Sequence, residues 1–179
     1  MTISISAEAF WTSIEDAWAA AAQTLPEADR PSIAAARSTL VSPTASSEDR
    51  LAAISTLDKA ERAFLDAIRT YLGTLTQGDL GQWDEHCAQA LYAIDTAAIH
   101  EVLDGSDDGF LYTRGFVVSQ GRKYWELVKE DVETYGVDGA ENESFCYIAA
   151  HFCNDKFGEW PKASVSRESC SNAEGWKDV

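Results

Sequence analysis

Residues 104–125 read DGSDDGFLYTRGFVVSQGRKYW and hold the densest mixture of acids, glycines and aromatic side chains in the chain. Ser106 suits the position that caps a helix N-terminus. Asp107 and Asp108 then fall in the first turn, where the helix dipole favours negative charge. At about 100° per residue, the apolar side chains of this stretch cover nearly the whole circumference of the helix. Helices of that kind are usually buried, so we expect a buried central helix near 107–120.

Arg114 lies within the apolar stripe of this helix. A guanidinium keeps its charge, so a buried arginine needs a carboxylate and several further acceptors. Asp104, Asp107 and Asp108 are the nearest acids in sequence. Asp107 is about two helical turns from Arg114, or roughly 10 Å along the axis, so the partner of Arg114 stays open between these acids and a carboxylate on another segment. Arg114 then either forms a structural ion pair that fixes the helix start or holds an anion in a binding site.

The second role defines a candidate ligand or partner site made of Asp107, Asp108, Arg114 and Gln120. Polar groups concentrated on an otherwise apolar helix are typical of a pocket. Adjacent Asp107 and Asp108 point about 100° apart on a helix, which is a poor geometry for one shared task. A divalent cation held by Asp104, Asp107 and Asp108 is the alternative, but the regular ligand spacing of an EF-hand is missing. We therefore predict no metal site and no catalytic residue.

The chain resembles a known family through this stretch and an N-terminal aromatic pair. The matching residues are Phe10-Trp11, Ile14, Ser106-Asp107-Asp108-Gly109-Phe110, Arg114 and Ser119-Gln120-Gly121-Arg122. They resemble the bacterial domain of unknown function 4240 family, and the likeness runs roughly over residues 10–160. Thr113 stands where the family tends to have an aromatic residue, and Phe116 where it tends to have Trp. The resemblance supports the fold and implies no established activity.

Composition bounds the class of protein. A chain of 179 residues with 45% hydrophobic and 11% aromatic residues is long enough for one domain with a core. The net charge is -16, from 30 acids against 14 bases. This charge argues against binding to nucleic acid or to anionic membranes, and it is compatible with a basic protein partner. Acidity that serves only solubility is the alternative.

Location and redox state follow from the N-terminus and the cysteines. Residues 1–6 have no basic region, and no apolar run in the chain is long enough to span a membrane. We therefore expect a cytoplasmic protein with free thiols at Cys87, Cys146, Cys153 and Cys170. Cys146 and Cys153 lie about 10 Å apart on a helix, which is too far for a disulfide.

Helical periodicity covers most of the chain, and no stretch alternates long enough to predict a sheet. The expected helices are 7–24, 29–41, 47–72, 80–103, 107–135 with a kink or stop at Gly121, and 141–157. We predict an all-α fold, a single-domain bundle of six or seven helices over 1–161 with a sub-boundary at 42–47. Residues 162–179 form a tail that wraps the surface or is partly disordered, with Trp176 as its anchor.

Sequence motifs disfavour several chemistries. The chain has no P-loop, no dinucleotide fingerprint, no zinc-ligand spacing and no nucleophile elbow, while a Cys–His nucleophile pair stays open. The leading hypothesis is a non-enzymatic, acidic protein-binding module without a cofactor, immunity-like or antitoxin-like, that binds a basic partner. The alternative is a small-molecule binder or enzyme with a pocket centred on Arg114 and the Asp107/Asp108 pair. A third hypothesis is a homo-oligomer.

Overall fold

A computed structural model describes residues 5–103 and 105–177, which contain helices and connecting segments but no strand. The all-α prediction is confirmed. Helices in the described part of the chain are α1 (Ala7–Thr24), α2 (Arg30–Leu40), α3 (Ser47–Gly73), α4 (Gln77–Tyr92), α5 (Ala97–Leu103), α6 (Asp107–Ser119), α7 (Arg122–Glu130), α8 (Val132–Tyr135), α9 (Glu143–Cys146) and α10 (Ile148–Phe157). None of these helices combines the length and the hydropathy that crossing a bilayer requires.

The prediction of one helix over 80–103 is wrong. Helix α4 ends at Tyr92, and α5 starts again at Ala97. In the break, the Thr96 hydroxyl accepts a hydrogen bond from the Ile99 N–H at 3.3 Å, as capping residues do. The break places the fully buried Asp95 outside a regular helix, where its carboxylate meets groups from elsewhere in the chain.

The stop predicted at Gly121 is present, because α6 ends at Ser119 and α7 begins at Arg122. Gly121 has a φ of 96°, which disfavours any residue with a Cβ. A Cβ at this position would also collide with the Glu15 carboxylate of α1. The predicted helix over 141–157 divides as well, at Tyr147, into α9 and α10. A further division, at Asp131, separates α7 from α8. Together these divisions explain why the described residues form more helices than the six or seven expected.

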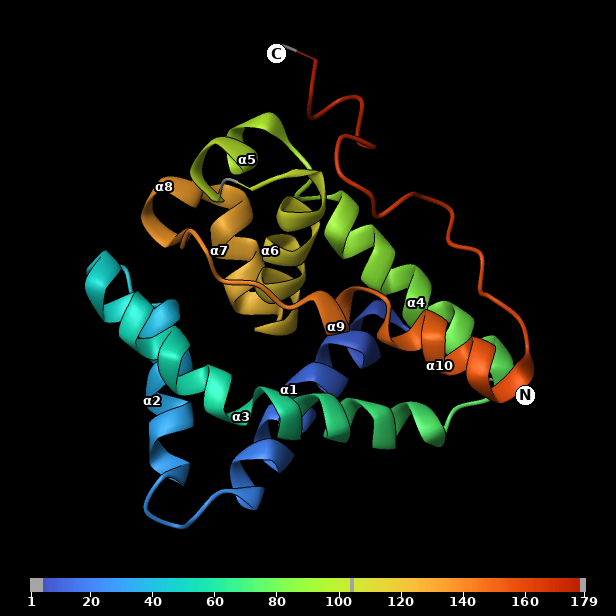
Figure 1. The fold of residues 1–179 in the computed structure, drawn as a ribbon, viewed down its shortest axis with the longest axis horizontal. Helices are drawn as coiled ribbons and strands as arrows, with labels where there is room; N and C mark the ends of the chain where they lie inside the picture. The colour runs from blue at the N-terminus through green and yellow to red at the C-terminus, as the bar shows by residue number, and fades with distance from the viewer. Residues whose placement is uncertain (1–4, 104, 178–179) are drawn as a thin grey trace.

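Apolar packing holds the helices together. Helices α1 and α2 both pack against α3, and α10 packs against α4 (Figure 1). The Trp18 ring of α1 stacks on Phe64 of α3 with centroids 4.4 Å apart, and Phe10 meets Trp83 of α4 at 4.8 Å. Burying each such side chain contributes about 1.5–3 kcal/mol. The apolar face of α1 thereby joins the N-terminal part of the chain to the core.

Helix α6 lies in the middle of the fold and contacts α4, α5, α7 and α9. The Ser106 hydroxyl caps its N-terminus by accepting a hydrogen bond from the Gly109 N–H at 3.2 Å. Its buried residues are Phe110, Leu111, Thr113, Arg114, Gly115, Phe116, Val117, Val118 and Ser119. The expectation of a buried central helix therefore matches the burial of α6.

After α10 the chain continues to residue 177 without a helix and passes along α4 toward α5 (Figure 1). We refer to residues 162–177 as the tail. Arg167 is buried, and the indole N–H of Trp176 donates to Asp95 Oδ1 at 3.0 Å. Buried groups thus hold this segment in place, although it has no regular secondary structure.

Candidate functional site

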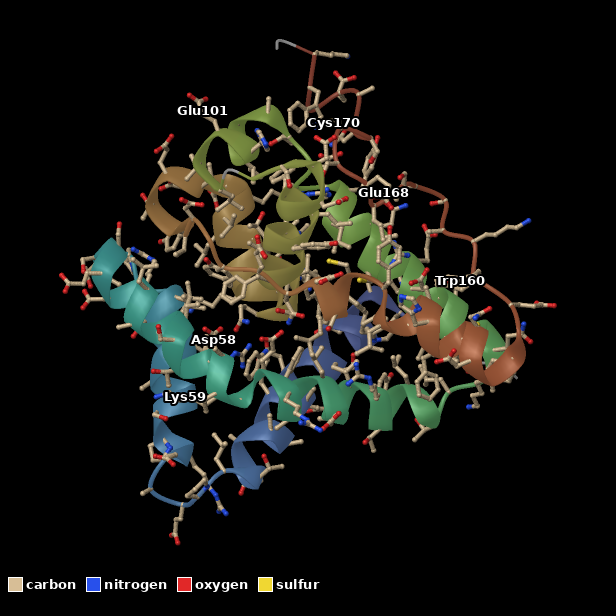
Figure 2. The ribbon with its side chains drawn as sticks, in the orientation of Figure 1. Asp58, Lys59, Glu101, Trp160, Glu168 and Cys170 are labelled. Carbon is tan, nitrogen blue, oxygen red and sulfur yellow. The ribbon has the colours of Figure 1, made fainter. Side chains whose placement is uncertain are left out.

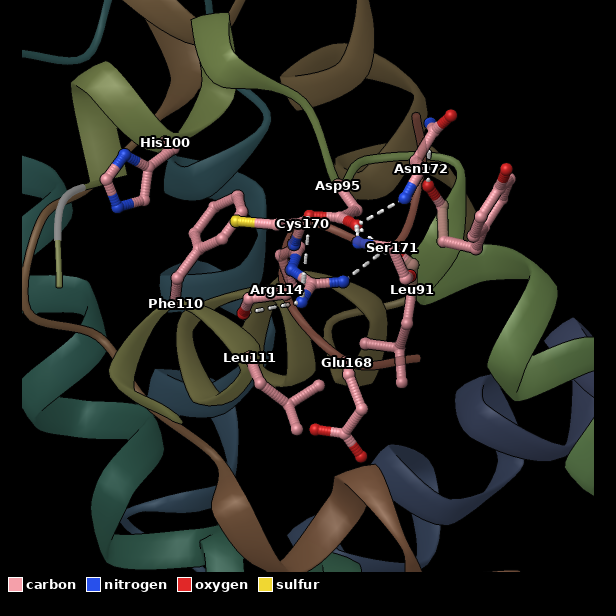
Figure 3. Close-up of polar contacts among 12 residues, drawn as sticks. Leu91, Asp95, His100, Phe110, Leu111, Arg114, Glu168, Cys170, Ser171 and Asn172 are labelled. Carbon is pink, nitrogen blue, oxygen red and sulfur yellow. Dashed lines mark hydrogen bonds and ion pairs between the residues drawn. The ribbon is translucent and has the colours of Figure 1, made fainter. Parts of the chain in front are cut away.

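Arg114 is fully buried, and its partners come from three other segments (Figure 3). Its Nη1 donates to the Leu91 carbonyl oxygen at 3.0 Å, and its Nη2 donates to Ser169 Oγ at 3.0 Å. Among the described residues, the nearest carboxylate is that of Asp95, with 4.0 Å between Nη2 and Oδ1. The guanidinium carbon also lies 4.7 Å from the centroid of the Phe110 ring. The acid that balances Arg114 is therefore on the α4–α5 connection.

Asp95 joins this cluster to the tail. Its carboxylate accepts the main-chain N–H groups of Cys170 at 3.0 Å, Ser171 at 2.8 Å and Asn172 at 2.9 Å, besides the Trp176 indole. These donors replace the water that burial removes from the carboxylate. Burial lowers the pKa of Arg114 from its usual value, and the Asp95 charge opposes that shift. The Arg114 guanidinium remains charged. Asp95 therefore pairs with Arg114 and also binds the tail, so the ion pair and the bound position of the tail stabilise each other.

The predicted site residues do not share one cavity. Asp107 and Asp108 are exposed, and within the described residues neither carboxylate contacts the Arg114 guanidinium. Asp107 is linked to Arg114 through Ser169: the Ser169 hydroxyl accepts from Arg114 and donates to the Asp107 main-chain oxygen at 2.5 Å. Asp104 lies outside the described residues. Since the tail covers Arg114, a ligand pocket centred on this residue stays a prediction that requires the tail to move.

Gln120 belongs to a different environment, at the other end of α6. It follows Arg114 by six residues, or roughly 9 Å of helix axis. Its carbonyl oxygen accepts from Arg37 Nη2 of α2 at 2.7 Å. Its side chain is 5% exposed, and Oε1 has no hydrogen-bond partner among the described residues. The structure therefore separates Gln120 from the other three predicted residues.

A second buried ion pair was missed by the sequence analysis. Arg167 Nη2 of the tail donates to Asp84 Oδ2 of α4 at 2.7 Å, and its Nη1 donates to the Cys146 carbonyl oxygen at 2.5 Å. Burial raises the pKa of Asp84, while Arg167 opposes the rise. Asp84 and Asp95 both follow a buried leucine of the α4 stripe by four residues, at Leu80 and Leu91. An acid at such an apolar position is the sequence signal that could have revealed each site.

The cysteines are free thiols, as predicted. Burial raises the pKa of Cys146 to about 12 and that of Cys87 still further. A thiol with such a pKa forms almost no thiolate at neutral pH and is a poor nucleophile. This weakens the Cys–His alternative at both positions. No group of three or more His, Cys, Asp or Glu residues is placed to hold a metal ion in the part of the chain that the structure describes.

Two open cavities lie beside α10. One, of about 650 Å³, is lined by residues of α3, α9 and α10 that include Arg69, Glu143, His151 and Asp155. The other, of about 500 Å³, lies between α4 and the start of the tail and is lined in part by Trp160. The Trp160 ring also meets His151, with centroids 5.0 Å apart. Trp160 therefore lines the second cavity and contacts His151 of the first, and Figure 2 shows it beside α10.

Comparison with known proteins identifies the family. Residues 49–154 match the family model described as "Protein of unknown function (DUF4240)", and this region is more than half of the chain. The chain belongs to the DUF4240 family. The resemblance found in the sequence is thus confirmed for the family. No curated protein and no solved structure matches the chain.

The buried charged residues lie partly inside and partly outside the DUF4240 region. The matched residues contain Asp84, Asp95 and Arg114, whereas Arg167 and the rest of the tail follow the match. Phe10-Trp11 precedes it, and the central motif at 106–122 lies inside it. In this chain, the tail beyond the DUF4240 region supplies the ion-pair partner of Asp84 and the main-chain donors to Asp95.

Proposed function

We propose that this DUF4240 protein is a bacterial, cytoplasmic, non-enzymatic protein-binding module, immunity-like or antitoxin-like, whose partner is a basic protein. The observation that carries the proposal is the exposure of Trp160, which lines the second cavity and has 52% of its surface accessible. Tryptophan is usually well buried, and it is enriched among the residues that contribute most to protein interfaces. We define the Trp160 surface as Phe157, Trp160 and the two cavities.

The shape of the Trp160 surface suits a protein partner. Phe157 is 37% exposed and precedes Trp160 by three residues, so two large apolar side chains are accessible together. The neighbouring cavities offer recesses for side chains of a partner. Interfaces commonly combine such an aromatic centre with a polar rim.

Charge selects the kind of partner. The charged side chains that line the two cavities, histidine aside, are the acids Glu85, Glu143, Asp155 and Glu159 and the bases Arg69 and Lys162. Four acids against two bases give this surface the sign of the whole chain, whose net charge is -16. Complementary charge raises the rate of encounter and disfavours partners of like charge. A basic protein is therefore the occupant that we expect.

The test compares Trp160→Ala with Leu51→Ala, because Leu51 of α3 is exposed to a similar extent, 51%. A partner is recovered from the producing cells at low salt, identified and purified, and its affinity for each variant is then measured. We expect a basic partner, a loss of at least about tenfold for Trp160→Ala, no change for Leu51→Ala, and weaker binding as salt increases.

Three outcomes would overturn the proposal. A partner that binds Trp160→Ala as tightly as the unmodified chain would place the interface elsewhere. An affinity that does not depend on salt would exclude the electrostatic part of the proposal. Recovery of the chain itself, as a homo-oligomer, would replace the basic partner by a second copy.

A further inference from the structure

A third cavity, of about 370 Å³, lies where α1 and α2 meet the turn between α6 and α7. Its polar lining includes Glu15 of α1, Arg37 of α2, Gln120 of the turn and Lys123 of α7. It is separate from the Trp160 surface, since the two share no lining residue. Cavities of this size commonly hold small molecules.

Two buried polar atoms at this cavity lack a partner in the described structure. One is Gln120 Oε1, on a side chain that is 5% exposed. The other is Arg37 Nε. The Gln120 amide nitrogen reaches only Ser119 Oγ, at 3.4 Å. Buried polar groups in folded proteins are almost always hydrogen-bonded, so an unpaired amide beside a cavity indicates a partner that is not part of the chain.

The charged groups around the cavity offer both signs to a ligand. Arg37 is held in place, because it donates to both Glu15 carboxylate oxygens, at 2.8 Å and 3.0 Å, and to the Gln120 carbonyl at 2.7 Å. Half of the Glu15 side chain remains exposed. Lys123 is exposed and makes no hydrogen bond or ion pair with any described residue. The lining of the cavity therefore offers a ligand an unpaired ammonium as well as carboxylate and amide oxygens.

The remaining lining is apolar. Leu40 and Tyr124 are buried and Val41 is half-buried beside the cavity. The Tyr124 hydroxyl already donates to the Tyr135 carbonyl oxygen at 2.9 Å, so only its ring remains for a ligand. This wall suits an aliphatic side chain of a ligand rather than a second polar group.

We propose that this cavity binds a free α-amino acid with an apolar side chain. Lys123 binds the carboxylate of the amino acid, and Gln120 Oε1 and the Glu15 carboxylate accept hydrogen bonds from its ammonium group. The apolar side chain packs against Leu40 and Val41. Gln120 Oε1 is screened from water in the structure, so contact with the ligand requires rotation of the Gln120 amide. The inference goes beyond the proposed partner and does not depend on it.

The ligand test is a calorimetric titration of the full chain with L-leucine. Two matched probes accompany it: 4-methylpentanoate lacks the ammonium group, and 3-methylbutylamine lacks the carboxylate. We expect leucine to bind and each probe to bind at least about tenfold more weakly. The proposal is overturned if leucine, valine and methionine all fail to bind, or if a probe binds as tightly as leucine.

Gln120→Met tests the role of the amide. Methionine preserves the length of the side chain and removes the unpaired oxygen, so we expect a melting temperature that is unchanged or higher. Leucine affinity should nevertheless fall at least about tenfold. A purely structural Gln120 would give the opposite result, a lower melting temperature with unchanged leucine affinity, and that result would contradict the proposal.

Lys123→Ala tests the carboxylate contact, with Lys129→Ala as its control on the same helix. Both lysines are exposed, but Lys129 lies over the Trp125 ring and does not line the cavity. We expect Lys123→Ala to weaken leucine and 4-methylpentanoate and to leave 3-methylbutylamine unchanged, while Lys129→Ala changes none of them. If both substitutions weakened leucine binding equally, only the net charge of the protein would matter, and the proposal would be wrong.

Discussion

Helix α1 and the tail both lie outside the DUF4240 region, and they attach to it by different physical means (Figure 1). Helix α1 packs through apolar side chains, as when Trp18 stacks on Phe64. The tail packs through buried charge, as when Arg167 pairs with Asp84. Apolar burial depends on area and tolerates small changes of geometry. A buried ion pair depends on both partners being present and well placed.

This contrast predicts different responses to the same kind of damage. Shortening an apolar side chain leaves a cavity, whereas removing one partner of a buried pair leaves a charge without compensation. Ionic attachment also responds to pH, because the carboxylate can take up a proton. Four experiments use these differences, in order of decreasing effect.

Ending the chain at residue 161 should have the largest effect. This truncation removes Arg167, the ion-pair partner of Asp84. It also removes the tail N–H groups that donate to the Asp95 carboxylate. The broken Arg167–Asp84 pair costs about 3–5 kcal/mol, and the buried Asp95 carboxylate loses its tail donors as well, so the total loss is comparable to the whole stability of an ordinary domain. We expect no cooperative thermal transition by circular dichroism. Adding Asp84→Leu, Asp95→Leu and Arg114→Met should restore a transition in the shortened chain, and failure to do so would show that the tail contributes by other means.

Arg167→Ala should destabilise the full chain by about 3–5 kcal/mol at neutral pH, because Asp84 stays buried without its partner. Burial already raises the pKa of Asp84 in the folded chain, and loss of Arg167 raises it further. The folded state then binds a proton more readily than the unfolded state, so stability is recovered as the pH falls and is lost as it rises. Denaturant titrations between about pH 4 and pH 7 measure this. If Arg167→Ala lowered the free energy of unfolding equally at about pH 4 and at about pH 7, the destabilisation would not come from the Asp84 charge.

Trp18→Ala should cost about 3–5 kcal/mol through the cavity that it leaves. The lost hydrogen bond from the Trp18 indole to the Ser119 carbonyl oxygen, 2.7 Å long, adds to the cost. Unlike Arg167→Ala, this change alters no ionisable group, so its penalty should stay constant over the same pH range. Trp160→Ala is the control, because Trp160 is exposed and its loss should change stability little.

Asp107→Asn and Asp108→Asn should have the smallest effects, about 0.3–1 kcal/mol each. Both residues are exposed in the first turn of α6, where their charge interacts with the helix dipole. Asp138→Asn, at an exposed position outside the helices, should change nothing. Thermal melts at low salt measure the difference. Losses of several kcal/mol would instead revive a direct role for these acids near Arg114.

The sequence predicted the features that depend on local apolar spacing and missed those that depend on buried charges paired with distant residues. The first helix was predicted with its bounds because Ser6 caps it, accepting from the Ala9 N–H at 3.1 Å, and because its apolar spacing is helical. The break after Tyr92 was not predicted. Asp95 lies in this break, and the N–H groups that its carboxylate accepts lie 75 residues or more further along the chain. Helical periodicity reports local burial, and it does not report which distant groups will satisfy a charge.

The candidate site was predicted only in part for the same reason. Burial of Arg114 could be inferred from its place on an apolar stripe, and a carboxylate on another segment was one of the partners left open. That Asp95 is this carboxylate follows only from the folded arrangement. Gln120 was grouped with Arg114 because both are polar residues on one helix, yet their environments lie on different sides of the fold.

Asp95 binds the tail at positions 170–172 through main-chain N–H groups. The Asp95 carboxylate accepts N–H groups at positions 170, 171 and 172, which every amino acid except proline can supply. Cys170 has a φ of 60°, a conformation that glycine and asparagine also adopt readily. Substitutions can therefore accumulate along this segment while its path is preserved. A relative that keeps an acid at the equivalent of position 95 can therefore hold a tail of different sequence at these three positions.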